Sequence, residues 1–149
     1  MSLDQLYRSA ILEHNRNLRN FGRLDAPTHS ARGLNALCGD DLIVDLAVAS
    51  GGMIEDVAFH GEAGAITLSS GSMMTVAIRG RPVSEALALK SALTCLLRAE
   101  EVTEELRVEL GELAALEGVR RYPSRIKAAL LAWEAMRAAL EGEALATTE

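Results

Sequence analysis

The sequence predicts an α+β domain in which a small antiparallel sheet packs against several helices. Apolar residues at helical spacing open the chain, alternating apolar residues at 42–48 and 53–59 flank a Gly-rich turn, and helical patterns fill most of the second half. Of the 149 residues, 49% are hydrophobic and 24% are charged, which suits one core without disulfides. We therefore expect a single domain over residues 1–142 and a frayed tail over 143–149.

The first helix has a clear start. Ser2 and Gln5 form a capping-box pattern, and the apolar spacing after them predicts a helix to about Arg16. Residues 17–36 are rich in Asn, Arg, Gly and Ser, so we expect a long irregular connection with at most short extended pieces.

A hairpin should follow this connection. Residues 42–48 and 53–59 alternate or carry β-branched and aromatic side chains, and Ser50-Gly51-Gly52 supplies the turn between them. Directly before the hairpin stands Cys38-Gly39-Asp40. A thiol and a carboxylate therefore lie two residues apart, in a Gly-containing turn at the mouth of a strand.

The helices of the second half each show a start or a stop. A helix over 66–79 should end at Gly80, Ser84 can cap the next helix, Thr103 can cap a shorter acidic one, and Pro123 suits the first turn of the last.

Two places in these helices carry side chains that could act as nucleophiles. Ser70-Gly71-Ser72 lacks the Gly-x-Ser-x-Gly form of a nucleophile elbow, so we expect a core helix there. Cys95 lies in an apolar helical stretch, where we expect a small packing residue shielded from solvent.

Composition excludes several classes of function. The net charge is −6, and basic residues cluster only in short pieces such as Arg120-Arg121, so we expect no nucleic-acid partner. The longest apolar run of the last helix, residues 128–133, is far shorter than the roughly 20 residues of a membrane span. No signal peptide opens the chain, and two unrelated cysteines give no disulfide framework. We expect a cytoplasmic protein without membrane contact, and a homo-oligomer stays open.

Several short pieces, in order along nearly the whole chain, are typical of one family. They are Leu6-Tyr7-Arg8, Asn20-Phe21-Gly22, Cys38-Gly39-Asp40, Phe59-His60-Gly61-Glu62, Ser72-Met73-Met74, Leu116-Glu117-Gly118-Val119, and Tyr122-Pro123-Ser124-Arg125-Ile126-Lys127 with Leu131-Ala132-Trp133. This order resembles the IscU/NifU-N family of iron–sulfur cluster assembly scaffold proteins. The acidic helical insertion near residues 100–118 resembles the SufU-type branch. The resemblance implies an α+β fold.

The resemblance also implies a site in which three cysteines and one aspartate surround zinc or a nascent cluster. Cys38 and Asp40 match the first part of that site. The other two cysteine positions hold Gly64 and Ala128, whose side chains cannot coordinate a metal. We therefore expect an incomplete metal site at Cys38 and Asp40, with His60 as an alternative third ligand.

Arg125 and Lys127 are the remaining charges that the resemblance places near the site. They could offset thiolate charge or pair with Asp40, or they could be solvated residues at a helix start.

Three functional hypotheses follow. The leading one is an assembly protein without a stably bound cofactor, which accepts sulfur on Cys38 from a cysteine desulfurase or assists other iron–sulfur assembly proteins. Weak binding of zinc or of an iron–sulfur cluster would then require ligands from a partner, and we expect no enzyme activity of its own.

The alternative is a pseudo-scaffold that occupies the desulfurase surface without receiving sulfur, with Cys38 a leftover thiol beside Asp40 and Asp41. A thiol-dependent hydrolase using Cys38 with His29 or His60 ranks last, because no base stands at a recognisable spacing.

Overall fold

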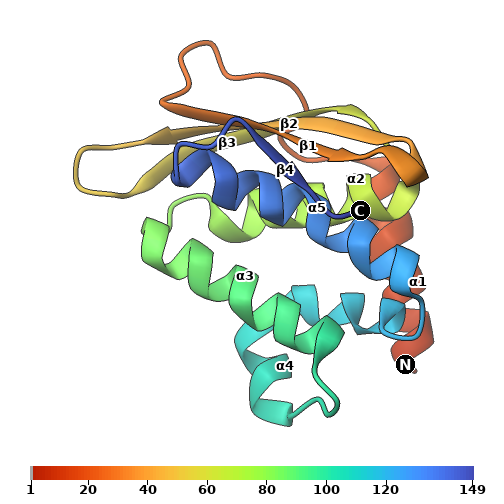
Figure 1. Cartoon of the computed structure of the whole chain (residues 1–149). Coiled ribbons are helices and arrows are strands. Elements are labelled where there is room, and N and C mark those ends of the chain that lie inside the picture. The colour runs from red at the N-terminus through yellow and green to blue at the C-terminus, as the bar shows by residue number, and fades with distance from the viewer. Residues whose placement is uncertain (1) are drawn as a thin grey trace.

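A computed structural model describes residues 2–149 as a four-stranded sheet with helices packed beneath one face (Figure 1). The elements in chain order are α1 (Leu3–Arg16), β1 (His29–Asn35), the short 3-10 helix η1 (Ala36–Cys38), β2 (Asp40–Val48), β3 (Ile54–Glu62), α2 (Ala65–Ile78), α3 (Val83–Arg98), α4 (Glu104–Leu110), the 3-10 segment η2 (Gly111–Val119), α5 (Pro123–Leu140) and β4 (Leu145–Thr147). The predicted α+β class is confirmed. No helix in the described part of the chain combines the length and apolar character needed to cross a bilayer.

The sheet has the order β3-β2-β1-β4. The predicted hairpin is confirmed as β2 and β3, and β1 pairs with β2 in the antiparallel sense. The expectation of an irregular connection up to residue 36 is wrong at its end, because β1 spans seven of those residues. Its core-facing residues Ala31, Gly33 and Asn35 are small or polar, so the strand carries no alternating apolar signal.

The small residues on the core-facing side of β1 let the last helix approach the sheet closely. A Cβ atom added at Gly33 would lie 3.2 Å from Ala135 Cβ and from Leu131 Cγ, both on α5. The pairing with β2 and the packing of α5 therefore hold β1 in the sheet where its own propensity does not.

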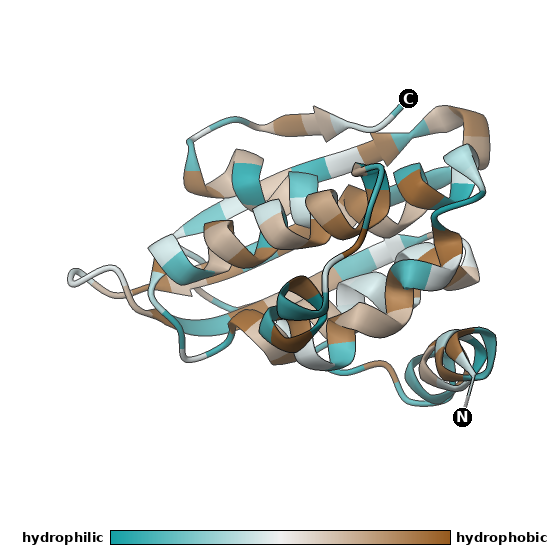
Figure 2. Cartoon of the chain, turned by 90° about the horizontal axis from the view of Figure 1, so that it is seen from below, coloured by the Kyte–Doolittle hydropathy of each residue, from teal (hydrophilic) through white to brown (hydrophobic). Residues whose placement is uncertain are grey.

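The tail over residues 143–149 does not fray. Leu145–Thr147 form β4, which pairs in parallel with β1 at the edge of the sheet, where Figure 2 shows it near the C-terminus. Ala146 is buried in the core. A three-residue strand is too short for a periodic signal, and its order comes from the pairing with β1.

The helices α2 and α5 form the layer next to the sheet. Trp133 of α5 is fully buried, and its indole N–H donates to Ser70 Oγ of α2 at 3.2 Å. The Ser70 hydroxyl donates in turn to the carbonyl oxygen of Ala129 at 2.6 Å. The expected core helix around Ser70-Gly71-Ser72 is confirmed, since all three residues are buried.

Most of the expected helix boundaries are confirmed. Ser2 caps α1 in a capping box, Thr103 caps α4, and Pro123 opens α5. Ser84 does not cap α3, because that helix already begins at Val83 after Pro82.

The connection between α1 and β1 lies over part of the outer face of the sheet. It is held by Asp45 of β2, a fully buried carboxylate that accepts hydrogen bonds from Arg23 at 2.6 Å, from the Leu24 N–H at 3.1 Å and from Ser30. Burial raises the pKa of Asp45, but these hydrogen bonds outweigh burial and hold the pKa below its usual range. The resulting stabilisation is present above the unfolded-state pKa of an aspartate and is lost as the pH falls through the folded-state pKa.

Gly118 of η2 offers a test of how α1 is seated. A Cβ atom there would lie 2.5 Å from Cγ and 2.7 Å from Cβ of Tyr7, so the backbone of one segment must shift to admit it. We predict that Gly118→Ala lowers the free energy of unfolding by about 1–3 kcal/mol, the usual cost of overpacking. Urea denaturation measures this. Gly51→Ala is the control, because a Cβ atom there meets nothing within 4 Å; equal effects of the two substitutions would contradict the packing described.

Candidate functional site

The Cys38 turn joins β1 to β2 at one end of the sheet. Asn35 and Asp40 are register partners at the ends of the two strands, and the single turn of η1 lies between them. Gly39 follows with φ at 73°, a left-handed conformation that closes the turn and that glycine adopts without strain. Cys38 is exposed, and the neighbouring Leu37 is 83% exposed. The turn therefore presents the thiol to solvent beside an apolar side chain.

Asp40 lies in the same turn but points into the protein. Its side chain is buried, with one carboxylate oxygen accepting the Gly64 N–H at 2.9 Å and the other accepting the Thr67 hydroxyl at 2.6 Å. Gly64 is the N-cap of α2 and Thr67 is in its first turn. Asp40 therefore supplies from another strand the acceptor that α2 lacks in its own capping residue.

The structure places Gly64 beside the Cys38 turn. A Cβ atom added at Gly64 would lie 3.8 Å from Asp40 Oδ1, with no closer neighbour. Ala128 is in the second turn of α5 and is 9% exposed. α5 packs on β1 with Leu131 and Ala135 over Gly33. The chain reverses after α5 into β4, which runs parallel to β1, so the start of α5 lies toward the end of β1 that leads into η1.

His60 does not join the turn. It lies on β3 next to Phe59, whose side chain is buried in the core, so the exposed His60 occupies the opposite face of the sheet. Its ring lies 5.1 Å from the ring of Phe21. Within residues 2–149, no three His, Cys, Asp or Glu side chains gather in a way that could hold a metal ion.

The two basic residues at the start of α5 also have other surroundings. The Arg125 guanidinium lies over the Tyr122 ring, 4.3 Å from its centroid, while the two oxygens of Asp40 are already bonded to α2. Neither Arg125 nor Lys127 makes an ion pair with any residue that the structure describes. Of the alternatives for these two residues, the pairing with Asp40 is therefore not formed.

No histidine assists the exposed thiol. His29 is at the opposite end of β1 from the turn, where its Nδ1 contacts the Thr28 hydroxyl at 2.7 Å. The prediction for the other cysteine is wrong: Cys95 is exposed. α3 buries its neighbours Leu93, Leu96 and Leu97, and Cys95 falls on the solvent side of the same turn.

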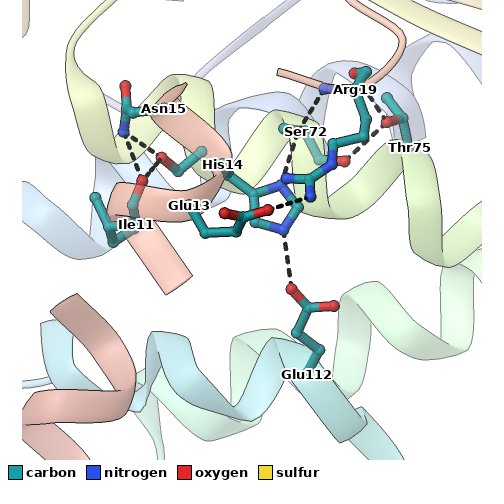
Figure 3. Close-up of polar contacts among 9 residues, drawn as sticks. Ile11, Glu13, His14, Asn15, Arg19, Ser72, Thr75 and Glu112 are labelled. Carbon is teal, nitrogen blue, oxygen red and sulfur yellow. Dashed lines mark hydrogen bonds and ion pairs between the residues drawn. The ribbon is translucent and has the colours of Figure 1, made fainter. Parts of the chain in front are cut away.

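A buried polar cluster that the sequence did not reveal joins α1 to the rest of the protein (Figure 3). His14 Nδ1 lies 2.7 Å from Ser72 Oγ of α2, and His14 Nε2 lies 2.9 Å from a carboxylate oxygen of Glu112 of η2. The Arg19 N–H also donates to Ser72 Oγ at 2.9 Å. The chain of contacts has the order of a hydrolytic triad, but Ser72 is fully buried, so the cluster fastens α1. Ser72 and Glu112 are 58 and 98 positions away from His14 in the sequence, so no local pattern links the three residues.

Comparisons with known proteins agree with this architecture. Residues 6–141 match the family model described as NifU-like N terminal domain. The zinc-dependent sulfurtransferase SufU of Bacillus subtilis is 34% identical over 135 residues, covering 91% of this chain and 89% of that protein. The iron–sulfur cluster assembly scaffold protein IscU of Streptococcus pyogenes is 35% identical over 143 residues, covering 95% and 87%.

Solved structures give the same result. A crystal structure described as an iron–sulfur cluster assembly scaffold protein for the SUF system, from Fervidobacterium islandicum, superposes with a TM-score of 0.82 at 27% identity, over 91% of this chain and 97% of that one. The N-terminal part of a NifU-like protein from Brucella abortus superposes with a TM-score of 0.82 at 27% identity, over 94% and 96%.

The two adjacent aspartates of the turn allow a matched test of the Asp40 contacts. We predict that Asp40→Ala lowers the free energy of unfolding by about 1–3 kcal/mol, because α2 loses its cap and the Gly64 N–H loses its partner. Asp41→Ala should change stability little, since Asp41 pairs with Arg32 at the exposed surface. Urea denaturation with a chelator present measures both effects. An Asp40→Ala protein as stable as the parent would show that the cap is dispensable.

Proposed function

Because this chain belongs to the family of NifU-like N-terminal domains, we propose that it serves iron–sulfur cluster assembly as a SufU/IscU-type protein without a metal site of its own. In this proposal Cys38 accepts sulfur from a cysteine desulfurase, or the chain assists the desulfurase or a complete scaffold. The observation that carries the proposal is the turn itself: an exposed thiol stands beside a carboxylate whose two oxygens are both engaged.

The residues of the turn do not fit the zinc named for the Bacillus subtilis relative. A structural zinc site takes four ligands from Cys, His or carboxylate side chains. Cys38 and Asp40 are two, and a metal at Asp40 would compete with the Gly64 N–H and the Thr67 hydroxyl. Complete zinc-finger sites bind with about 10–16 kcal/mol, which half a set cannot reach. Weak zinc or an iron–sulfur cluster would require ligands from a partner.

Sulfur transfer to Cys38 needs no metal and no oxidant. The Cys38 thiolate attacks the terminal sulfur of a persulfide on the desulfurase. The sulfur–sulfur bond of that persulfide breaks, its electron pair leaves with the desulfurase cysteine, and Cys38 carries the new persulfide. Electrons balance because one persulfide replaces another.

The local electrostatics are compatible with such an acceptor. Both neighbouring carboxylates have positive partners: Asp41 pairs with Arg32 at 2.7 Å, and Asp40 caps the positive end of the α2 dipole. The highly exposed Leu37 gives a partner protein an apolar contact next to the sulfur.

One observation favours the alternative, a pseudo-scaffold that binds the desulfurase or a complete scaffold as a regulatory or structural partner. Among residues 2–149 no basic side chain hydrogen-bonds to the Cys38 sulfur, whereas reactive cysteines commonly lie beside a cationic group. A partner would have to supply that group for transfer to occur.

The two exposed cysteines allow a direct test of the acceptor role. We predict that incubation with a cysteine desulfurase and ³⁵S-cysteine labels the parent protein and Cys95→Ser, but not Cys38→Ser. Non-reducing gels and mass mapping after alkylation locate the label. Label that persists in Cys38→Ser contradicts the acceptor role. Desulfurase binding without any label supports the pseudo-scaffold.

Restoring the two missing thiols tests the correspondence of Gly64 and Ala128 with ligand positions. We predict that Gly64→Cys with Ala128→Cys binds about one zinc ion per chain and melts at a higher temperature, because a ligand that binds only the native state adds RT ln(1 + [L]/Kd) to stability. Zinc analysis and thermal melts measure this for the parent, each single variant and the double variant.

The control for restoration is a pair of cysteines far from the turn. Ser50→Cys with Ala88→Cys adds two exposed thiols on the β2–β3 turn and on α3. It should take up no more zinc than the parent. A folded Gly64→Cys/Ala128→Cys protein that behaves like this control would contradict the proposed positions.

A further inference from the structure

A cleft of about 610 Å³ lies between α1, the end of η2 and the start of α5. The start of α5 lies beside α1 in Figure 1, and Gly118 of η2 is in contact with Tyr7 of α1. Four guanidinium groups and two phenols line the cleft, from Arg8, Arg120, Arg121, Arg125, Tyr7 and Tyr122. We call it the arginine cleft. It is a basic feature on a chain whose net charge is −6.

The carboxylates of the arginine cleft are already neutralised. Asp4 pairs with Arg8 at 3.2 Å, and Glu117 pairs with Arg107, which lies outside the cleft, at 2.8 Å. Three guanidinium groups of the cleft, those of Arg120, Arg121 and Arg125, make no ion pair with any described residue. Arg120 is bonded to carbonyl oxygens of α3, which leaves Arg121 and Arg125 for a ligand. Both are exposed, so a ligand can reach them.

The remaining groups of the cleft hold these cations in place. Arg120 donates to the carbonyl oxygens of Leu96 and Ala99 at the end of α3, which fixes the turn that carries Arg121. The Arg125 guanidinium stacks over Tyr122. Burial raises the pKa of Tyr7, although Arg125 opposes that rise, so Tyr7 keeps its hydroxyl proton at neutral pH and can donate it. Tyr122 and Arg125, at the positive end of the dipole of the 18-residue α5, both line the cleft.

We propose that the arginine cleft binds a phosphate group, either inorganic phosphate or the phosphate of a small molecule. Guanidinium forks match phosphate oxygens in pairs, and the Tyr7 phenol supplies a donor from another direction, which suits a tetrahedral dianion better than a planar carboxylate. The volume lies within the roughly 300–1,000 Å³ of small-molecule sites. This inference is independent of sulfur transfer at Cys38.

Calorimetric titration at constant ionic strength tests the proposal with inorganic phosphate, pyrophosphate and ribose 5-phosphate as separate probes. We expect saturable binding of one anion per chain. Tighter binding of ribose 5-phosphate than of inorganic phosphate assigns the site to phosphorylated small molecules, and the reverse order assigns it to the free ion. In ¹⁵N-labelled protein the amide signals of Gly118 and Tyr122 should shift on binding.

A charge-matched pair of variants completes the experiment. Arg121→Gln with Arg125→Gln should weaken binding at least about tenfold, because the unpaired guanidiniums make the charge-assisted bonds. Arg16→Gln with Arg98→Gln removes the same charge from exposed positions outside the cleft and should leave affinity unchanged. Equal losses of affinity in both variants would mean that the anion responds only to the overall charge of the protein, and would overturn the proposal. Absence of saturable binding of all three probes, or shifts confined to other residues, would overturn the proposal.

Discussion

The carboxylate of Asp40 connects the sheet to the helical layer at the end where the candidate site lies. A buried carboxylate must find donors in the protein, and Asp40 finds them in the Gly64 N–H and the Thr67 hydroxyl at the start of α2. These two contacts fix where β2 begins relative to α2. The turn that carries Cys38 is therefore anchored where it enters β2, while the Cys38 side chain stays exposed to solvent. An ordered turn and an accessible sulfur follow from the same pair of hydrogen bonds.

The packing of α5 sets the second constraint. Trp133 and the alanines of α5 lie against β1 and α2, and Gly33 keeps the helix close to the sheet. α1 is also attached through a buried contact of His14 with Ser72 and a partly buried one with Glu112, while its residues Leu3, Leu6 and Leu12 stay exposed. α1 thus joins the core through Tyr7, with Ala10 and Ile11 packed beside it, and through the polar contacts of His14.

Local sequence patterns predict the elements that are stabilised by contacts between residues close together in the chain. The hairpin, the capping box at Ser2 and the Thr103 cap depend on neighbours in sequence, and the structure confirms them. β1 and β4 depend on strands and helices far away in the chain, so their own residues carried no signal.

The site shows the same division. The turn position of Cys38 could be predicted, because a glycine follows it and a strand begins directly after. The contacts of Asp40 with α2 and the isolation of His60 on the other face depend on sheet register, which the sequence did not specify. The expectation for Cys95 is wrong because α3 packs only one of its faces, so a residue within an apolar helical stretch can still lie on the solvent side.

The proposed correspondence of Gly64 and Ala128 with ligand cysteines explains how the turn can stay ordered without metal. Thiolates at these positions would place negative charge around a buried carboxylate, and without a cation such charges repel one another strongly in a weakly polarisable interior. Glycine and alanine carry no such charge, and the backbone N–H of Gly64 binds Asp40. Under this proposal the absence of two thiols is coupled to a gain for a metal-free fold: the aspartate that would complete a metal site caps a helix instead, and the Cys38 thiol keeps its place in the turn.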